Sequence, residues 1–163
     1  MKFAQLTDLA AAAHALVARS QKAPSNTNPE KAGGYLVIGS EGFEERYILK
    51  IGNCPAEKDN KYRNFAQEKA HRLFSDWLRD PSSISSWQTR EPNLNRWGGA
   101  VLFPIIGERG PSCDIISFSG LIEPADEALG LMLGYQFKLA TDPKFAERVI
   151  DISANKVYRE MMQ

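Results

Sequence analysis

The chain has 163 residues, 43% of them hydrophobic, and its 20 basic residues balance its 20 acidic ones. A chain of this length buries roughly 70% of its surface on folding, so the composition predicts a folded domain and excludes a disordered tail. The zero net charge argues against binding of nucleic acid or of an anionic membrane surface. Two cysteines are too few for a disulfide framework and favour a reducing, cytoplasmic compartment.

No targeting or membrane segment is predicted. The apolar run at residues 9–13 is shorter than the roughly seven apolar residues that a secretory signal needs. No stretch approaches the roughly 20 apolar residues of a membrane-spanning helix.

The first third of the chain predicts a helix followed by a hairpin. Apolar residues recur every three or four positions over residues 6–19, which is typical of an amphipathic helix. Residues 20–34 are rich in proline, asparagine and glycine and predict a long connection. Two apolar runs, residues 35–39 and 45–52, flank Ser40-Glu41-Gly42 and predict a β-hairpin.

A second amphipathic helix is predicted over residues 62–78, with apolar and charged residues on opposite faces. It should end at Asp80, because Pro81 disfavours helical geometry in the residue before it. Residues 81–97 follow without a regular pattern, and structureless segments of that length tend to be functional or mobile.

The remainder predicts a second hairpin, from residues 99–106 and 113–121, and then two helices. Glu123-Pro124 opens a helix that is apolar around most of its circumference, so other parts of the protein must cover it. The last helix is predicted over about residues 142–161, starting at Asp142-Pro143.

Gly130 and Gly134 lie one turn apart in the third predicted helix and leave room for another backbone. We expect the last helix to pack there. The alternative is a subunit interface in a homo-oligomer, with Gly130, Leu131 and Gly134 as its candidate residues.

The element order predicts an α+β fold, in which an antiparallel β-sheet is flanked by helices. Strands arrive as hairpins rather than alternating with helices, which favours antiparallel pairing. No repeat or linker divides the sequence, so residues 1–163 are predicted to form one domain that ends in the helix of residues 142–161.

Familiar catalytic and metal-binding motifs are missing from the sequence. His14 and His71 are the two histidines, which alone do not make a metal site, and no zinc, P-loop or dinucleotide motif accompanies them. His71 is predicted on the surface, whereas His14 flanks the apolar stripe of the first helix and either is partly buried or faces a ligand. Cys54 and Cys113 have no base beside them and are predicted to be small apolar side chains. We therefore predict no catalytic residue and no metal.

The segment of residues 81–97 has the composition of a ligand-binding loop. Trp87, Arg90, Arg96 and Trp97 combine flat aromatic rings with guanidinium groups, which proteins use to bind planar or anionic small molecules. The same residues would also suit a lid packed on its own domain or a contact between subunits. No wider basic surface accompanies them, so a nucleic-acid site is not expected.

Three segments follow one another in an order known from one protein family. They are residues 65–70 (FAQEKA), 97–105 (WGGAVLFPI) and 116–127 (ISFSGLIEPADE). They are similar, in turn, to a helical Ala-x-x-Lys-Ala signature, a Gly-Gly entry into the third strand, and a strand ending in Val-Ser-Gly before a helix that opens with Asp-Glu. On these motifs, residues 3–140 resemble the family of the haem-binding protein HbpS and the glycolate-operon protein GlcG, which includes the C-terminal domain of PduO-type proteins.

The resemblance implies a profilin-like fold and an oligomeric protein, and some members of the family bind haem or cobalamin-related ligands. It also implies that a histidine in the first helix can ligate haem, a role that would fall on His14.

We therefore expect a cytoplasmic, non-catalytic, homo-oligomeric accessory domain that binds a small planar or anionic ligand, with haem as the first ligand to test. The candidate ligand-binding residues are Lys69, Trp87, Arg90, Arg96 and Trp97. The alternatives are an assembly protein without a small ligand, which would use the third predicted helix as its surface, and an enzyme of unknown type.

Overall fold

An antiparallel sheet organises the chain, in a computed structural model that describes residues 3–40, 45–107 and 110–163. Its strands are β1 (Ala32–Ser40), β2 (Glu45–Asn53), β3 (Ala100–Gly107) and β4 (Gly110–Ser119), in the order β2-β1-β4-β3. Every neighbouring pair is antiparallel. The predicted α+β class is therefore confirmed, while the turn predicted at residues 40–42 lies partly outside the described residues.

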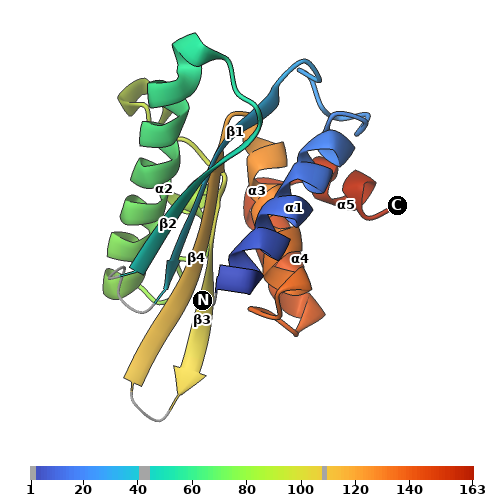
Figure 1. Cartoon of the computed structure of the whole chain (residues 1–163). Helices are drawn as coiled ribbons and strands as arrows, with labels where there is room; N and C mark the ends of the chain where they lie inside the picture. The colour runs from blue at the N-terminus through green and yellow to red at the C-terminus, as the bar shows by residue number, and fades with distance from the viewer. Residues whose placement is uncertain (1–2, 41–44, 108–109) are drawn as a thin grey trace.

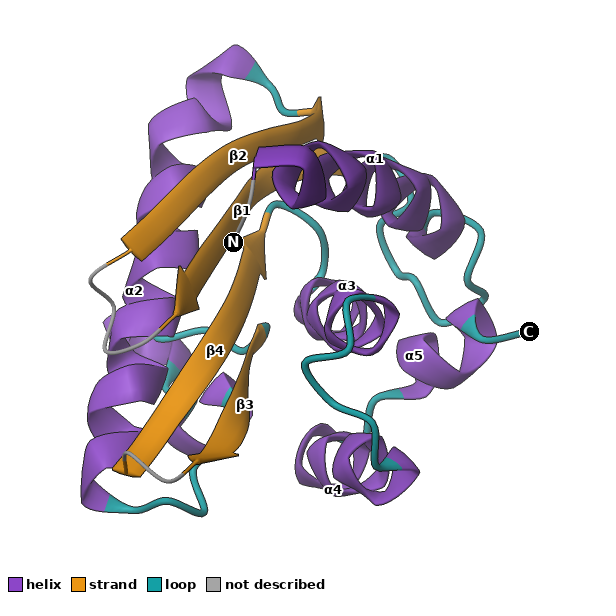
Figure 2. Ribbon diagram, turned by 60° about the horizontal axis from the view of Figure 1, so that its bottom comes forward, coloured by secondary structure: helices purple, strands orange, loops and turns teal. Residues whose placement is uncertain are grey.

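Helices cover both faces of the sheet. They are α1 (Phe3–Ser20), α2 (Asp59–Arg79), α3 (Glu123–Gln136), α4 (Pro143–Ser153) and α5 (Lys156–Met161). Figures 1 and 2 show α2 on one face and α1, α3, α4 and α5 on the other. None of the described helices has the length and apolar character that a membrane span requires.

The two faces bury separate hydrophobic clusters, because successive side chains of a strand point to opposite sides. Val37 and Ile115 pack against α2, together with its residues Leu73 and Trp77. Their neighbour Leu36 belongs to the larger cluster beneath α1 and α3. The alternation explains why α2 needs an apolar stripe, whereas α3 is buried over most of its surface.

The boundary of α2 agrees with its predicted end. The helix stops at Arg79, and Asp80 is extended with φ of −140° before Pro81. Its start lies three residues earlier than the predicted residue 62, at Asp59.

The segment of residues 81–97 is folded rather than structureless, which corrects the prediction. It contains two short 3-10 helices, Ser86–Thr89 and Pro92–Leu94. The hydroxyl of Ser85 accepts a hydrogen bond from Trp87 N, and the Gln88 side chain accepts one from Ser85 N. These bonds form a capping box, a local pattern that orders the backbone without any hydrophobic periodicity.

The predicted last helix of residues 142–161 is interrupted, which is a second correction. Ala154 has a left-handed φ of 53°, and Asn155 caps α5 by accepting a hydrogen bond from Tyr158 N. Ser153 and Asn155 also donate to the buried carboxylate of Glu127. These hydrogen bonds hold the segment between α4 and α5 against the first half of α3.

The two glycines of α3 face the sheet. They therefore do not contact the last helix, and they are not available to a second subunit. The atom nearest to a Cβ added at Gly130 would be Ile116 O, at 3.5 Å, and a Cβ at Gly134 would overlap the ring of Phe103. Leu131 is fully buried in the cluster beneath α3. Gly130, Leu131 and Gly134 therefore lie inside the protomer, which corrects their candidate role at a subunit interface.

Candidate functional site

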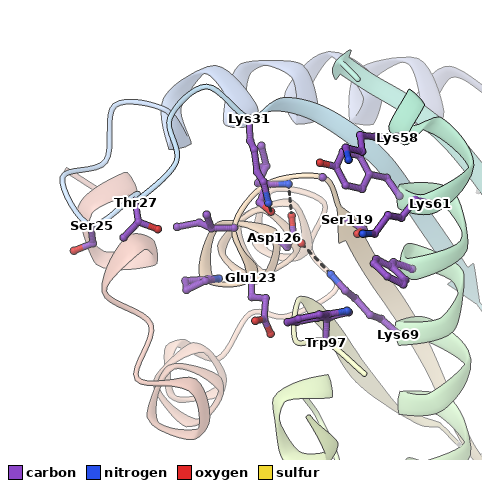
Figure 3. Close-up of a pocket in the computed structure, with 16 residues that line it drawn as sticks. Ser25, Thr27, Lys31, Lys58, Lys61, Lys69, Trp97, Ser119, Glu123 and Asp126 are labelled. Atoms are coloured by element: carbon purple, nitrogen blue, oxygen red, sulfur yellow. Dashed lines mark hydrogen bonds and ion pairs between the residues drawn. The ribbon is translucent and has the colours of Figure 1, made fainter. Parts of the chain in front are cut away.

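A cavity of about 620 Å³, called here the main cavity, lies where β4 ends and α3 begins. Figure 3 shows its surroundings, with the first half of α2 on one side and residues 25–31 on another. The wall of residues 25–31 is fastened to the C-terminal helix, because Ser25 N donates to Glu160 Oε2 at 2.8 Å. The cavity is thus built from segments that are distant in sequence.

Three lysines around the main cavity have no acidic partner. Lys31, Lys58 and Lys61 all line it, and their ammonium groups make no ion pair with the described residues. Lys31 Nζ donates to Leu121 O at 3.2 Å, and Lys61 Nζ lies 5.5 Å from the ring centroid of Phe65. The three ammonium groups add positive charge around the cavity outside any ion pair, although the charge of Lys31 also acts to lower the pKa of Asp126.

The two carboxylates of the main cavity are already paired. Lys69 Nζ donates to Asp126 Oδ2 at 2.9 Å and to Phe118 O at 2.8 Å. Burial raises the pKa of Asp126, and the neighbouring Lys69 opposes that shift. Both side chains are almost fully buried at the inner end of the cavity.

Glu123, the second carboxylate, binds Arg90 through both oxygens, at 2.7 and 2.8 Å. Burial acts to raise the pKa of Glu123, but hydrogen bonds from Arg90 and Gly98 N outweigh it and hold the pKa below its ordinary value. Neither Asp126 nor Glu123 is therefore free to neutralise the three lysines.

Aromatic side chains form the remaining wall. Tyr62 and Phe65 are half-buried on the side of α2 that faces the cavity, and Trp97 comes from the segment before β3. The rings of Phe65 and Trp97 are tilted by 51° with centroids 6.4 Å apart. Rings in this arrangement offer a flat or apolar ligand group a large contact area.

The structure brings two of the five predicted ligand-binding residues into the main cavity, namely Lys69 and Trp97. Arg90 supports the wall, since its guanidinium lies 5.9 Å from the Trp97 ring and 5.1 Å from the Trp87 ring. Trp87 lies against Gly98, where any added Cβ would overlap its indole. Arg96 is exposed, pairs with Glu91 at 3.3 Å and does not line the cavity.

His14 lies outside the main cavity. Its side chain is exposed on α1, and its Nδ1 accepts a hydrogen bond from Gly52 N at 3.1 Å. It therefore binds the edge strand β2, and the geometry gives no support to the haem-ligand role implied by the resemblance. His71 is exposed on α2, as predicted.

Cys113 lies in β4 and Cys54 in the loop after β2, and both are buried, as suits small apolar side chains. Burial raises the pKa of Cys113 to about 12 and also raises that of Cys54, so neither thiol is a thiolate at neutral pH. Over residues 3–40, 45–107 and 110–163, no three histidine, cysteine or acidic side chains cluster in a way that could hold a metal ion.

Sequence reasoning missed the three lysines as site residues. Lys58 lies just before α2 and Lys61 lies in its first turn, and exposed lysines at the start of an amphipathic helix usually have no role beyond solvation. Lys31 lies in a polar connection and reaches the cavity only through the fold.

Comparisons of the chain with protein-family models, with curated proteins and with solved structures give no match. The resemblance to the HbpS and GlcG family therefore stays a prediction from short motifs. The function has to be argued from the cavity itself.

Proposed function

We propose that this chain is a non-catalytic domain that binds a small, planar, negatively charged ligand in the main cavity. The observation that supports the proposal is the set of unpaired lysines, Lys31, Lys58 and Lys61, around a cavity with an aromatic wall. Ammonium groups bind carboxylate and phosphate through charge-assisted hydrogen bonds, and the rings suit a flat apolar group. The cavity volume of about 620 Å³ also lies in the range of small-molecule sites.

Binding is favoured over catalysis by the lining side chains. Among the described lining residues there is no histidine, the commonest general base of enzyme sites, to activate the hydroxyls of Ser25, Thr27 or Ser119. Lys69 is held by Asp126 and a backbone carbonyl rather than presented to a substrate.

Haem is one candidate, because it is planar and carries two carboxylates. The lysines and the aromatic wall suit these features, but histidine ligation of the iron does not fit, since His14 lies outside the main cavity. A bound haem would be held by its propionates and ring faces.

The fluorescence of Trp97 provides a direct test. Planar anions such as haemin and flavin mononucleotide should quench it saturably in the wild type, whereas the uncharged riboflavin should bind more weakly. Trp97→Phe should remove most of the signal change, while the matched variant Trp87→Phe, which lies outside the lining, should keep it.

For haemin, His14→Ala should leave the shift of the Soret band unchanged. If no planar anion gives a saturable signal, or if Lys58→Glu/Lys61→Glu binds as tightly as the wild type, the proposal is wrong.

We also propose, from the sequence alone, that the protein is a cytoplasmic homo-oligomer. Because Gly130, Leu131 and Gly134 are buried in the protomer, a subunit contact has to use another surface. Light scattering at micromolar concentration tests this, and a monomer would contradict it.

A further inference from the structure

A second cavity of about 200 Å³ adjoins the main cavity. It lies between the start of β1 and the end of β2, where Gly33 and Asn53 line it. Lys31, Tyr62 and Gly120 line both cavities. These three residues therefore form the boundary that the two cavities share, called here the junction.

The side chains of Lys31 and Tyr62 at the junction have hydrogen-bond donors that no protein acceptor fully satisfies. Lys31 Nζ makes one long hydrogen bond, to Leu121 O at 3.2 Å, which leaves two of its three N–H groups for a ligand. The Tyr62 hydroxyl makes no hydrogen bond to any residue in the described part of the chain, although the ring is half-buried. Burial raises the pKa of Tyr62, so the hydroxyl keeps its proton at neutral pH.

Gly120 contributes only backbone to the junction. It has a φ of 145°, and a Cβ added there would overlap Gly33 O. Only glycine fits this position, because the backbone at the start of β1 packs directly against it.

The acidic groups nearby do not satisfy these donors. Asp126 is paired with Lys69 and accepts Leu121 N at its other oxygen. Glu30 lines the second cavity only, is exposed and makes no ion pair with Lys31. A positive, donor-rich junction is the arrangement that binds a phosphate or carboxylate group.

We propose that Lys31 and Tyr62 form an oxoanion subsite at the junction, which binds a phosphate or carboxylate in the middle of a ligand that extends through both cavities. The inference rests on the proposed function for the planar end of the ligand. The inference adds that the anionic group lies in the middle of the ligand rather than at its end. A polar group on the far side of that anionic group would reach Asn28 and Asn53 in the second cavity.

The subsite can be tested with simple anions on the whole chain. Inorganic pyrophosphate and citrate are titrated while the backbone amide resonances of Gly33 and Gly120 are followed by NMR, with sodium chloride at equal ionic strength as the baseline. We expect saturable shifts at both glycines with at least one anion. A preference for pyrophosphate identifies a phosphate site, and a preference for citrate identifies a carboxylate site.

Matched variants separate the junction from general positive charge. Lys31→Met should weaken anion binding about tenfold and Tyr62→Phe about threefold, because each loses a hydrogen bond to a charged group. Lys58 lines the main cavity but not the second one, so Lys58→Met should weaken anion binding less. Lys22 is exposed and lines neither cavity, so Lys22→Met should not change anion binding. Circular dichroism and thermal melting confirm that each variant is folded.

The inference is overturned if neither anion shifts Gly33 and Gly120 saturably, or if Lys31→Met binds pyrophosphate as the wild type does. Either result leaves the proposed function standing if haemin or flavin mononucleotide still quenches Trp97. If planar ligands fail while pyrophosphate binds at the junction, the proposed function is wrong and the subsite remains.

Discussion

Lys69 of α2 and Asp126 of α3 form an ion pair at 2.9 Å, although the two helices lie on opposite faces of the sheet. The residues are 57 positions apart, and each is almost fully buried. The pair joins the two layers beyond the end of β4 and forms the inner end of the main cavity.

Removing one charge of this pair should destabilise the protein strongly. Asp126→Asn leaves the Lys69 ammonium buried without a counter-charge, and such a change typically costs about 3–5 kcal/mol in the free energy of unfolding. The double variant Lys69→Met/Asp126→Leu removes both charges and should recover most of that loss. Urea unfolding measures the three free energies, and a double variant as unstable as the single one would contradict the expectation.

Two glycines of α3 should respond oppositely to alanine. In Gly134→Ala the new Cβ overlaps the Phe103 ring, which itself packs on Phe145 at 5.3 Å between centroids, so the cost should be about 1–3 kcal/mol. Gly130→Ala meets no atom closer than 3.5 Å and should gain up to about 1 kcal/mol from helix propensity. Thermal melting of both variants checks this. Equal melting temperatures would show that α3 does not lie against β3 as described.

Glu127 should make the stability fall as the pH rises. It is fully buried, and burial raises its pKa, although hydrogen bonds from Ser153, Ser85 and Asn155 oppose the shift. Because its pKa in the folded state is raised, its stabilising contribution is complete below the ordinary glutamate pKa of about 4.3 and is lost as the pH passes through the raised value.

Glu127→Gln, which mimics the protonated carboxyl, should therefore flatten the dependence of the unfolding free energy on pH. The measurement is urea unfolding from pH 4 to pH 8 (roughly the range over which a raised carboxyl pKa acts). An unchanged slope in this variant would show that folding does not raise the pKa of Glu127.

His14→Ala should cost stability without affecting ligand binding. The change leaves Gly52 N without its side-chain acceptor, and a hydrogen bond of this kind contributes about 0.5–1.5 kcal/mol. The exposure of the site places the expected loss at the lower end of that range. Urea unfolding measures the loss, and the Trp97 titration provides the control. A change in ligand affinity would contradict the placement of His14 outside the main cavity.

Helices and strands could be predicted where buried apolar residues recur at regular intervals along the chain. The apolar stripe over residues 6–19 predicted α1, because the apolar residues of that stripe face the hydrophobic cluster between α1 and the sheet. The break at Ala154 could not be predicted, since alanine favours helix and the left-handed conformation there depends on bonds of neighbouring residues to Glu127.

The residues of the main cavity could be predicted only in part, because some of them come together only through the tertiary fold. Lys69 and Trp97 stood out as residues beside an apolar stripe and in an aromatic segment, and both line the main cavity. Lys31, Lys58 and Lys61 line the same cavity only because the fold places residues 25–31 and the start of α2 on different walls of it, a tertiary arrangement that no local pattern records.

Lys31, Lys58 and Lys61 lie outside both hydrophobic clusters, and Lys58 and Lys61 are exposed. If the main cavity binds an anion as proposed, substitutions at Lys58 and Lys61 should alter the ligand charge that it accepts with little loss of stability. Charge recognition and the integrity of the core would then be separable in this scaffold, and reversing these two lysines would be a practical route to redesigning it for a cationic ligand.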